Sequence, residues 1–226
     1  MINYPYVSIV VCAYNEEKIL NQCIDALLQQ KYPHDKYEII LVNDRSTDHT
    51  ADICMKAVKL KECQLPRITY LLNEHSGLSV ARNTGVFISK GDMIAYIDGD
   101  AIADEHWVLE IAKTFNNDDT IGAVGGKIEI LNTESWFALF IHWIHYYMEG
   151  KNGEEVIPLI GTNMAFRKEV FQERGGFFEN FKSRGDETSF TKLKVLPYFK
   201  QKTTADAVVH HERPWTFHQS GSITGF

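Results

Sequence analysis

The sequence feature that most constrains the fold is the octapeptide Met93–Asp100, which reads MIAYIDGD. Five apolar residues follow one another without alternation and stop at two aspartates, Asp98 and Asp100, with Gly99 between them. An unbroken apolar run of this length predicts a strand that is buried on both faces, as in a parallel sheet covered by helices. Residues two apart on an extended segment point to the same face, so we expect both carboxylates to project together from the end of the strand.

Two neighbouring carboxylates require compensation for their charge. Unit charges about 4 Å apart repel by roughly 4 kcal/mol at an effective dielectric constant of about 20. A raised pKa or a bound cation relieves this repulsion, and carboxylate oxygens are the ligands that Mg²⁺ and Mn²⁺ prefer. The pair therefore indicates a divalent-metal site. The alternative is that one or both aspartates cap the following helix.

Length and charge exclude several classes of protein. The 226 residues suffice for one α/β domain, and the net charge of −7 without a Lys/Arg block argues against a nucleic-acid partner. No apolar run has the roughly 18 residues of a transmembrane helix, and the N-terminus lacks the basic region of a signal peptide. The four cysteines form no CxxC pair, which favours free thiols in a reducing cytoplasm.

Strand-like runs alternate with helical patterns in the first half of the chain, which predicts βαβ units and a mainly parallel central sheet flanked by helices. The second half is less regular, and no linker divides it from the first, so a single domain over residues 1–226 is expected. The predicted strands span residues 7–13, 37–42, 67–72, 93–97, 121–131, 162–167 and 205–210. The predicted helices span residues 19–28, 48 onward, 77–90, 104–115, 136–148, 168–174 and 186–196. Ser46 or Thr47 is expected to cap the second helix.

The helix predicted over Trp136–Met148 is densely aromatic but too short to cross a bilayer. Core packing is the main interpretation, and an acceptor-binding wall or a face resting on a membrane is the functional alternative. His142 and His145 lie three residues apart in it without a third ligand nearby, and they are interpreted as packing residues.

Polar residues follow four predicted strand ends, the edge at which open α/β sheets bind ligands. These residues belong to the first four of five motifs, which occur in the order YNEE (14–17), VNDRSTDHT (42–50), N-x₃-GLSVARNTG (73–85), IDGD (97–100) and GTNMAFRKEVFQERGGF (161–177). In this order they resemble the family 2 glycosyltransferases, inverting enzymes with the Rossmann-like GT-A fold.

The resemblance implies a nucleotide-binding half, residues 1–100, and an acceptor-binding half, residues 101–226. Asp44 resembles the family's acceptor for the imide N–H of the nucleobase, and the loop at residues 14–16 resembles the one that holds base and ribose. Arg82 would neutralise phosphate or brace its loop; the alternative is a surface cation paired with a neighbouring acid. The residues expected to bind the nucleotide sugar are Ala13, Tyr14, Asn15, Glu16, Asp44, Asn73, Gly77, Arg82, Asp98 and Gly99.

The metal ligands and the catalytic base also come from the resemblance. Asp100 resembles the direct ligand of Mg²⁺ or Mn²⁺, and Asp98 resembles an acid on the ribose or metal side. His211 resembles a third metal ligand or a diphosphate contact, with His210 as the second choice.

Family members carry a base in an ED pair, which corresponds here to Asp186-Glu187 in reversed order. Alignment position favours Glu187 as the base, and side-chain length allows Asp186. The alternative is that both acids complement the dipole of a helix N-terminus.

The implied activity is metal-dependent, inverting transfer of a sugar from a UDP- or GDP-sugar to the hydroxyl of a glycan, a lipid-linked molecule or another acceptor. Cell-surface polysaccharide biosynthesis is the expected setting, in the cytoplasm or against the inner face of the membrane. The alternative is a weak or inactive sugar-nucleotide-binding protein of the same fold.

Three other classes fit less well. In phosphatases of the haloacid dehalogenase type the paired aspartates end the first strand, whereas here they end the fourth. No G-x₄-GK[ST] sequence exists, which excludes a P-loop. The loop at 14–18 lacks the glycines that nucleotidyltransferases carry there.

Overall fold

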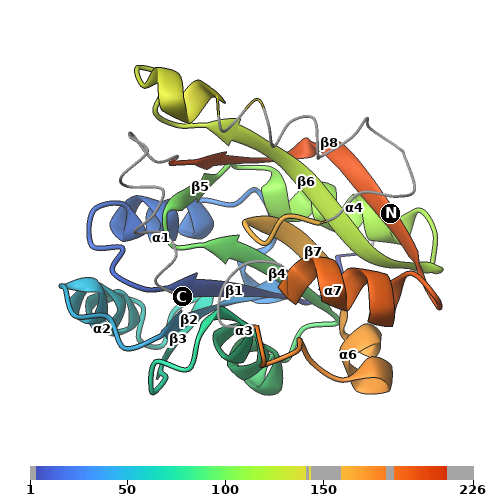
Figure 1. The fold of residues 1–226 in the computed structure, drawn as a ribbon. Coiled ribbons are helices and arrows are strands. Elements are labelled where there is room, and N and C mark those ends of the chain that lie inside the picture. Colours follow the sequence, from blue (N-terminus) through green and yellow to red (C-terminus); the bar gives the residue numbers. More distant parts are fainter. Residues whose placement is uncertain (1–3, 141–142, 144–158, 182–185, 213–226) are drawn as a thin grey trace.

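Four parallel strands from the first hundred residues form the half of the sheet that the apolar runs predict (Figure 1). β1 (Val7–Ala13) pairs with β2 (Tyr37–Asn43) on one side and with β4 (Met93–Asp98) on the other, and β3 (Arg67–Leu72) lies beyond β2. These data come from a computed structural model that describes residues 4–140, 143, 159–181 and 186–212. The predicted parallel βαβ organisation is confirmed for this half.

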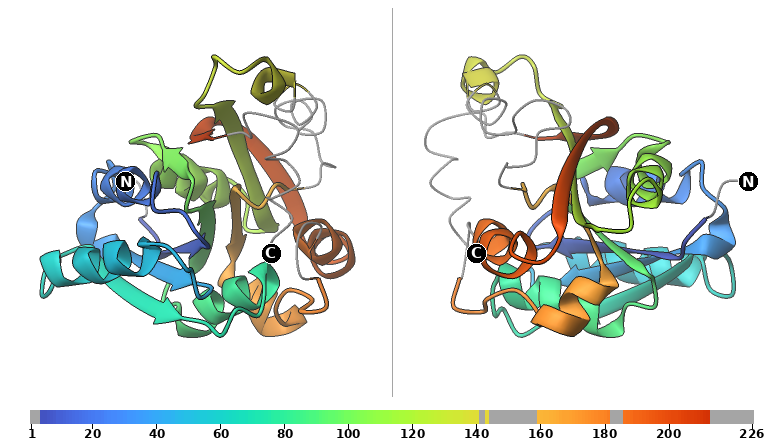
Figure 2. Two further views of the ribbon diagram at one scale, coloured as in Figure 1. Left: turned by 60° about the vertical axis from the view of Figure 1, so that its left-hand side comes forward. Right: turned by 90° about the vertical axis from the view of Figure 1, so that its right-hand side faces the viewer.

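The second half adds four strands and makes the sheet mixed. β7 (Asn163–Arg167) runs antiparallel to both β4 and β6 (Ile121–Ile130), and β6 pairs in parallel with β8 (Lys200–His211). The short β5 (Ala101–Ala103) pairs antiparallel with β8 and completes the order β3-β2-β1-β4-β7-β6-β8-β5. Figure 2 shows the end of β6 and the helical residues after it standing away from the parallel strands.

The helices cover both faces of the sheet, which explains the unbroken apolar runs. The helices are α1 (Leu20–Leu28), α2 (Thr50–Leu60), α3 (Leu78–Ile88), α4 (Trp107–Asn116), α6 (Lys168–Arg174), α7 (Asp186–Phe190) and the short η1 (His34–Lys36) and η2 (Thr191–Val195). In β4, Met93, Ala95 and Ile97 pack in the core with α1 and α4, whereas Ile94 and Tyr96 pack with α3, α6 and α7. Because successive side chains alternate between faces, a strand between two helical layers must be apolar at every position.

The observed elements differ from the predictions in several places. β5 was not predicted, because three residues carry no periodic signal. β8 begins five residues before the predicted strand, because its first residues are polar and partly exposed. The helix predicted over residues 186–196 is shorter and continues in η2 as a π-helical turn.

The helix predicted over 136–148 is described only at residues 136–140 and 143, where it is helical. His142 and His145 lie outside the described residues. Trp136 is 77% exposed and Phe137 is buried, so within the described part the helix has both a packed and an open side. In the described portion of the chain, the structure contains no helix with the length and apolarity to cross a membrane.

Candidate active site

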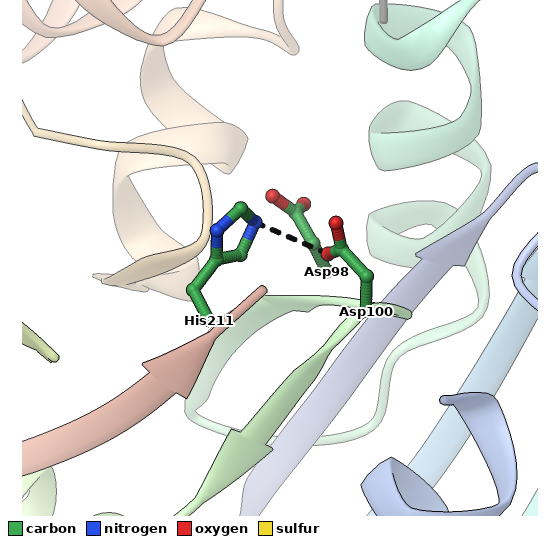
Figure 3. A group of neighbouring side chains, drawn as sticks. All are labelled: Asp98, Asp100 and His211. Atoms are coloured by element: carbon green, nitrogen blue, oxygen red, sulfur yellow. Dashed lines mark ion pairs between the residues drawn. The ribbon is translucent and has the colours of Figure 1, made fainter. Parts of the chain in front are cut away.

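Asp98, Asp100 and His211 form a group of potential metal ligands at the carboxyl edge of the sheet (Figure 3). Asp98 ends β4, Asp100 lies in the turn to β5, and His211 ends β8. Their ligand atoms all lie within 4.8 Å of one another, and His211 Nε2 is 3.1 Å from Asp100 Oδ1. The prediction that both aspartates and His211 come together is confirmed. The alternative of a helix cap is not, because β5 rather than a helix follows Asp100.

Glu16 adds a third carboxylate to this region. Burial, followed by the charges of Asp100 and Asp98, raises the pKa of Glu16 to about 9. Burial and the Asp100 carboxylate likewise raise the pKa of Asp98, against the opposing effects of Arg82 and His211. Both shifts have the same origin: partly buried carboxylates face one another without enough positive charge to balance them. A divalent cation would supply that charge.

The loop after β1 is held by the loop after β2. Asn15 has a φ of 59°, a left-handed conformation that asparagine tolerates better than most residues, and its Oδ1 accepts a hydrogen bond from the Thr47 backbone N–H at 2.8 Å. Asn15 N–H in turn donates to Ser46 Oγ at 2.9 Å. The expectation that Ser46 or Thr47 caps α2 is wrong, because Asp48 Oδ1 accepts the Thr50 N–H instead. Ser46 and Thr47 serve the contact between the two loops.

Asp44 lies at the predicted strand end but is fully buried. Its Oδ1 and Oδ2 accept hydrogen bonds from the backbone N–H groups of Ser76 and Gly77, each at 3.0 Å, and its own N–H donates to Ala13 O. Gly77 has a φ of 96° at the start of α3, a conformation that favours glycine. The Asp44 carboxylate therefore fixes the loop from β3 to α3, a task that the sequence analysis did not assign to it.

Tyr14, His75 and Asn73 border the same loop. The rings of Tyr14 and His75 stack with centroids 4.7 Å apart, and His75 Nδ1 lies 3.0 Å from the backbone oxygen of Asp44. The buried amide nitrogen Nδ2 of Asn73 has no hydrogen-bond partner among the described residues, so it is a donor available to a ligand. Gly99 packs close to Ala13, because a Cβ on Gly99 would lie 3.1 Å from the Ala13 Cβ. The predicted nucleotide-binding residues thus gather at neighbouring strand ends.

Arg82 is buried and faces the two candidate bases. Its Nη1 lies 2.6 Å from Asp186 Oδ1 and 3.4 Å from Glu187 Oε2. The alternative of a surface cation is wrong, since Arg82 is only 2% exposed, although a carboxylate partner is indeed present. Burial alone would raise the pKa of Asp186, but the Arg82 guanidinium and neighbouring hydrogen bonds lower it below its ordinary value. Burial and the adjacent Asp186 carboxyl raise the pKa of Glu187 to about 7.

Gly161 and Thr162, for which no role was predicted, lie between the aspartates of the potential metal site and the Asp186-Glu187 pair. Thr162 Oγ1 donates a hydrogen bond to Asp98 Oδ2 at 2.6 Å. A methyl group on Gly161 would overlap the Arg82 guanidinium, so the backbone can approach Arg82 only because residue 161 is glycine. Both residues belong to the GTN motif, but their contacts join positions far apart in the sequence.

Solved structures of known proteins share this fold. A mannosyltransferase, PcManGT from Pyrobaculum calidifontis, solved in complex with GDP-Man and Mn²⁺, matches 97% of this chain and 60% of its own with a TM-score of 0.78 at 22% identity. TarS 1-349 of S. aureus in complex with UDP-GlcNAc matches 95% of this chain and 60% of its own with a TM-score of 0.72 at 20% identity. The single domain therefore has the GT-A fold of glycosyltransferases.

Sequence comparison identifies the family. The family described as "Glycosyl transferase family 2" matches residues 8–175. A probable glycosyltransferase of Bacillus subtilis, YdaM, is 30% identical over 84% of this chain and 47% of its own length. A glucosyl-dolichyl phosphate glucuronosyltransferase of Haloferax volcanii is 28% identical over 80% of this chain and 58% of its own length. The chain thus spans about half the length of these relatives. The chain belongs to glycosyl transferase family 2.

Proposed function

We propose that this protein is a glycosyltransferase that moves a sugar from a UDP- or GDP-sugar to an acceptor hydroxyl, with a divalent metal ion and with inversion at the anomeric carbon. The observation that carries the proposal is the convergence of Asp98, Asp100 and His211 within 4.8 Å at the carboxyl edge of the sheet. The two solved structures of similar fold, one with GDP-Man and Mn²⁺ and the other with UDP-GlcNAc, support a nucleotide-diphosphate sugar as the donor. A lipid-linked or glycan acceptor is compatible with the name of the Haloferax volcanii relative.

The residues at this edge suit a divalent cation. Asp98, Asp100 and His211 would hold it, and it would neutralise charge on the departing diphosphate when bound. Carboxylates suit both Mg²⁺ and Mn²⁺, whereas an imidazole ligand favours the transition metals. We therefore expect Mn²⁺ to bind more tightly than Mg²⁺.

The donor contacts are assigned to the strand ends of residues 1–100. Tyr14 offers an aromatic face, Asn73 Nδ2 offers a buried donor, and Asp98 is an acid beside the metal group. Asp44 is proposed to accept the nucleobase imide N–H through a remaining carboxylate lone pair, since each of its oxygens accepts one backbone hydrogen bond. Residues 101–226 then provide His211, the two candidate bases and the acceptor side.

The transfer requires a base on the acceptor side, and we assign this role to Glu187. Its carboxylate accepts the proton of the acceptor hydroxyl as the hydroxyl oxygen bonds to the anomeric carbon. The bond from that carbon to the diphosphate oxygen breaks, and its electron pair leaves with the diphosphate. A base works best when its pKa lies near the operating pH, and the Glu187 pKa of about 7 meets this requirement.

The test uses UDP-GlcNAc and GDP-mannose as donors, Mn²⁺, and a panel of simple glycoside acceptors. NMR coupling constants of the product should show the anomeric configuration opposite to that of the donor. Glu187→Gln should abolish transfer while calorimetry still detects binding of the nucleotide. Glu173→Gln is the matched control, because Glu173 is an exposed glutamate of α6 whose ion-pair partner, in the described part of the chain, is Arg174.

Each contrary result is distinct. A product with retained configuration would exclude the single-displacement mechanism. Full activity of Glu187→Gln would move the base to Asp186. Tight binding of nucleotide by the wild type without transfer to any acceptor would support the inactive sugar-nucleotide-binding alternative.

A further inference from the structure

Arg82 is held in the protein interior by acids rather than exposed to a substrate. The side chain is 3% exposed, and its guanidinium contacts the fully buried Asp186 and the partly buried Glu187. Of the described residues, Phe177 lies alongside, with its ring centroid 5.6 Å from the guanidinium carbon. A buried charge is stable only beside an opposite charge, and removing one member of the pair leaves the other buried without compensation.

The two acids do not share Arg82 equally. The contact with Asp186 Oδ1 is 2.6 Å, a short charge-assisted hydrogen bond, whereas the contact with Glu187 Oε2 is 3.4 Å. Asp186 is also the more deeply buried of the two. Asp186 is thus the structural counter-ion of Arg82, and Glu187, beside it on α7, keeps the weaker contact.

The loop before β7 holds the guanidinium in place from another side. Gly161 packs against it so closely that no side chain fits, and the next residue, Thr162, binds Asp98. Gly161 therefore contacts Arg82, the partner of the two candidate bases, and Thr162 contacts Asp98, one of the potential metal ligands. This arrangement fixes the distance between the two functional groups through one short backbone segment.

We propose that Arg82 is a positioning residue for the general base: it binds Asp186 as its counter-ion and so orients Glu187 to accept the proton of the acceptor hydroxyl. This rests on the proposed function of Glu187. It also accounts for the reversed order of the Asp186-Glu187 pair, because the shorter side chain reaches the buried arginine and the longer one remains for the acceptor. The guanidinium is then not a ligand of the donor phosphates.

The electrostatics agree with this division. The charged groups that act on Glu187 include Asp186 of α7 and Arg82 of α3, and Asp98 of β4 acts on Arg82 in turn. Burial and Asp186 raise the pKa of Glu187, whereas Arg82 lowers it. Loss of the Asp186 charge should therefore lower the Glu187 pKa, and loss of the Arg82 charge should raise it.

The experiment measures the Glu187 titration directly, by ¹³C NMR of protein labelled at glutamate carboxyl carbons. Comparison with Glu187→Gln assigns the resonance. Asp186→Asn should lower the pKa of Glu187 and Arg82→Met should raise it, each by about one unit or more. Arg82→Lys keeps the charge without the fork of donors, so it should leave the pKa close to wild type. Arg167→Lys is the control, because Arg167 donates hydrogen bonds to backbone carbonyls of α4 and β6. It should leave the Glu187 pKa unchanged.

Kinetics with UDP-GlcNAc or GDP-mannose and Mn²⁺ separate positioning from donor binding. Arg82→Lys should lower kcat by about tenfold or more while the donor KM stays within about twofold. A donor KM raised about tenfold with unchanged kcat would instead assign Arg82 to the phosphates and overturn the proposal. If Arg82→Met does not fold, the nearly isosteric Asp186→Asn decides, and an unshifted Glu187 pKa in that variant overturns the proposal. Full activity of Glu187→Gln would refute the base itself, a failure of the proposed function rather than of the arginine's position.

Discussion

The protein should bind the nucleotide only when a cation neutralises the negative charge at Asp98, Asp100 and His211, which we call the metal group. The ligand atoms of Asp98, Asp100 and His211 lie within 4.8 Å of one another. Burial, followed by the charges of Asp100 and Asp98, raises the pKa of Glu16 to about 9. A phosphate charge at a comparable distance from one such carboxylate is repelled by about 3.5 kcal/mol at an effective dielectric constant near 20. Removing the cation should therefore weaken the binding of UDP or GDP by about two to three orders of magnitude.

The assay is calorimetric titration of UDP and of GDP into the protein with Mn²⁺ and then with excess EDTA. Asp100→Asn should lose most of the metal-dependent part of the affinity, because it removes one ligand and one charge. The same substitution should raise the melting temperature of the metal-free protein by a few degrees, because it relieves repulsion of about 1–3 kcal/mol. Added Mn²⁺ should stabilise the wild type and have little effect on the variant.

Asp119→Asn is the matched control. Its side chain is fully exposed in the turn before β6, at the opposite edge of the sheet, and its ion-pair partner is Arg167. It should change neither nucleotide affinity nor the response to Mn²⁺. An affinity for UDP and GDP that EDTA leaves unchanged would refute the reasoning. So would an Asp100→Asn variant that melts below the wild type without metal, since the aspartate would then be a structural partner rather than a source of repulsion.

Three further predictions concern single residues. The folded-state pKa of Glu16 is about 9, above its unfolded value, so the wild type without metal should lose stability as the pH rises toward 9. Glu16→Gln should flatten that dependence in melting curves, and an unchanged slope would contradict the shift. Asp44→Ala removes the acceptor of two backbone N–H groups and should cost about 1–3 kcal/mol in urea unfolding, besides raising the donor KM. An unfolding midpoint equal to that of the wild type would show that the loop does not depend on Asp44. Trp107→Phe removes the indole N–H that Asn163 Oδ1 accepts at 2.8 Å and should also cost about 1–3 kcal/mol, with nucleotide affinity unchanged. A loss of nucleotide affinity at constant stability would place Trp107 in the site instead.

The sequence predicts the parallel half of the sheet well because burial on both faces leaves an unmistakable pattern. Val7–Ala13 and Met93–Asp98 are apolar almost throughout, and every residue of β1 is buried. β8 lacks this pattern, since its first residues are polar and several are exposed. Its strand conformation depends on pairing with β6 and β5, a tertiary effect that local residue preferences do not contain.

In the candidate site, too, some features can be predicted from the sequence and others cannot. The positions of Asp44, Asp98 and Asp100 follow from a general rule, that ligand-binding residues come at the carboxyl ends of parallel strands. The partner of each does not follow from any rule of spacing. The Arg82–Asp186 contact joins residues 104 positions apart, and the Thr162–Asp98 contact joins residues 64 positions apart. Such contacts depend on how the two halves of the chain pack, so the sequence shows the candidates but not their pairing.

The sequence leaves open whether His210 or His211 lies beside Asp100, and the pairing of the short strand β5 with β8 decides between them. β5 pairs with β8 in a register that places Ala101 opposite His211, and Ala101 directly follows Asp100. A backbone hydrogen bond from Glu212 N–H to Asp100 O secures this register, and one from Leu131 N–H to His211 O joins the end of β8 to the end of β6. A slip of one residue would turn His211 away from Asp100 and bring His210 to its place, because successive side chains of a strand point to opposite faces. The pairing of these three β5 residues with β8 therefore places His211, rather than His210, beside Asp100.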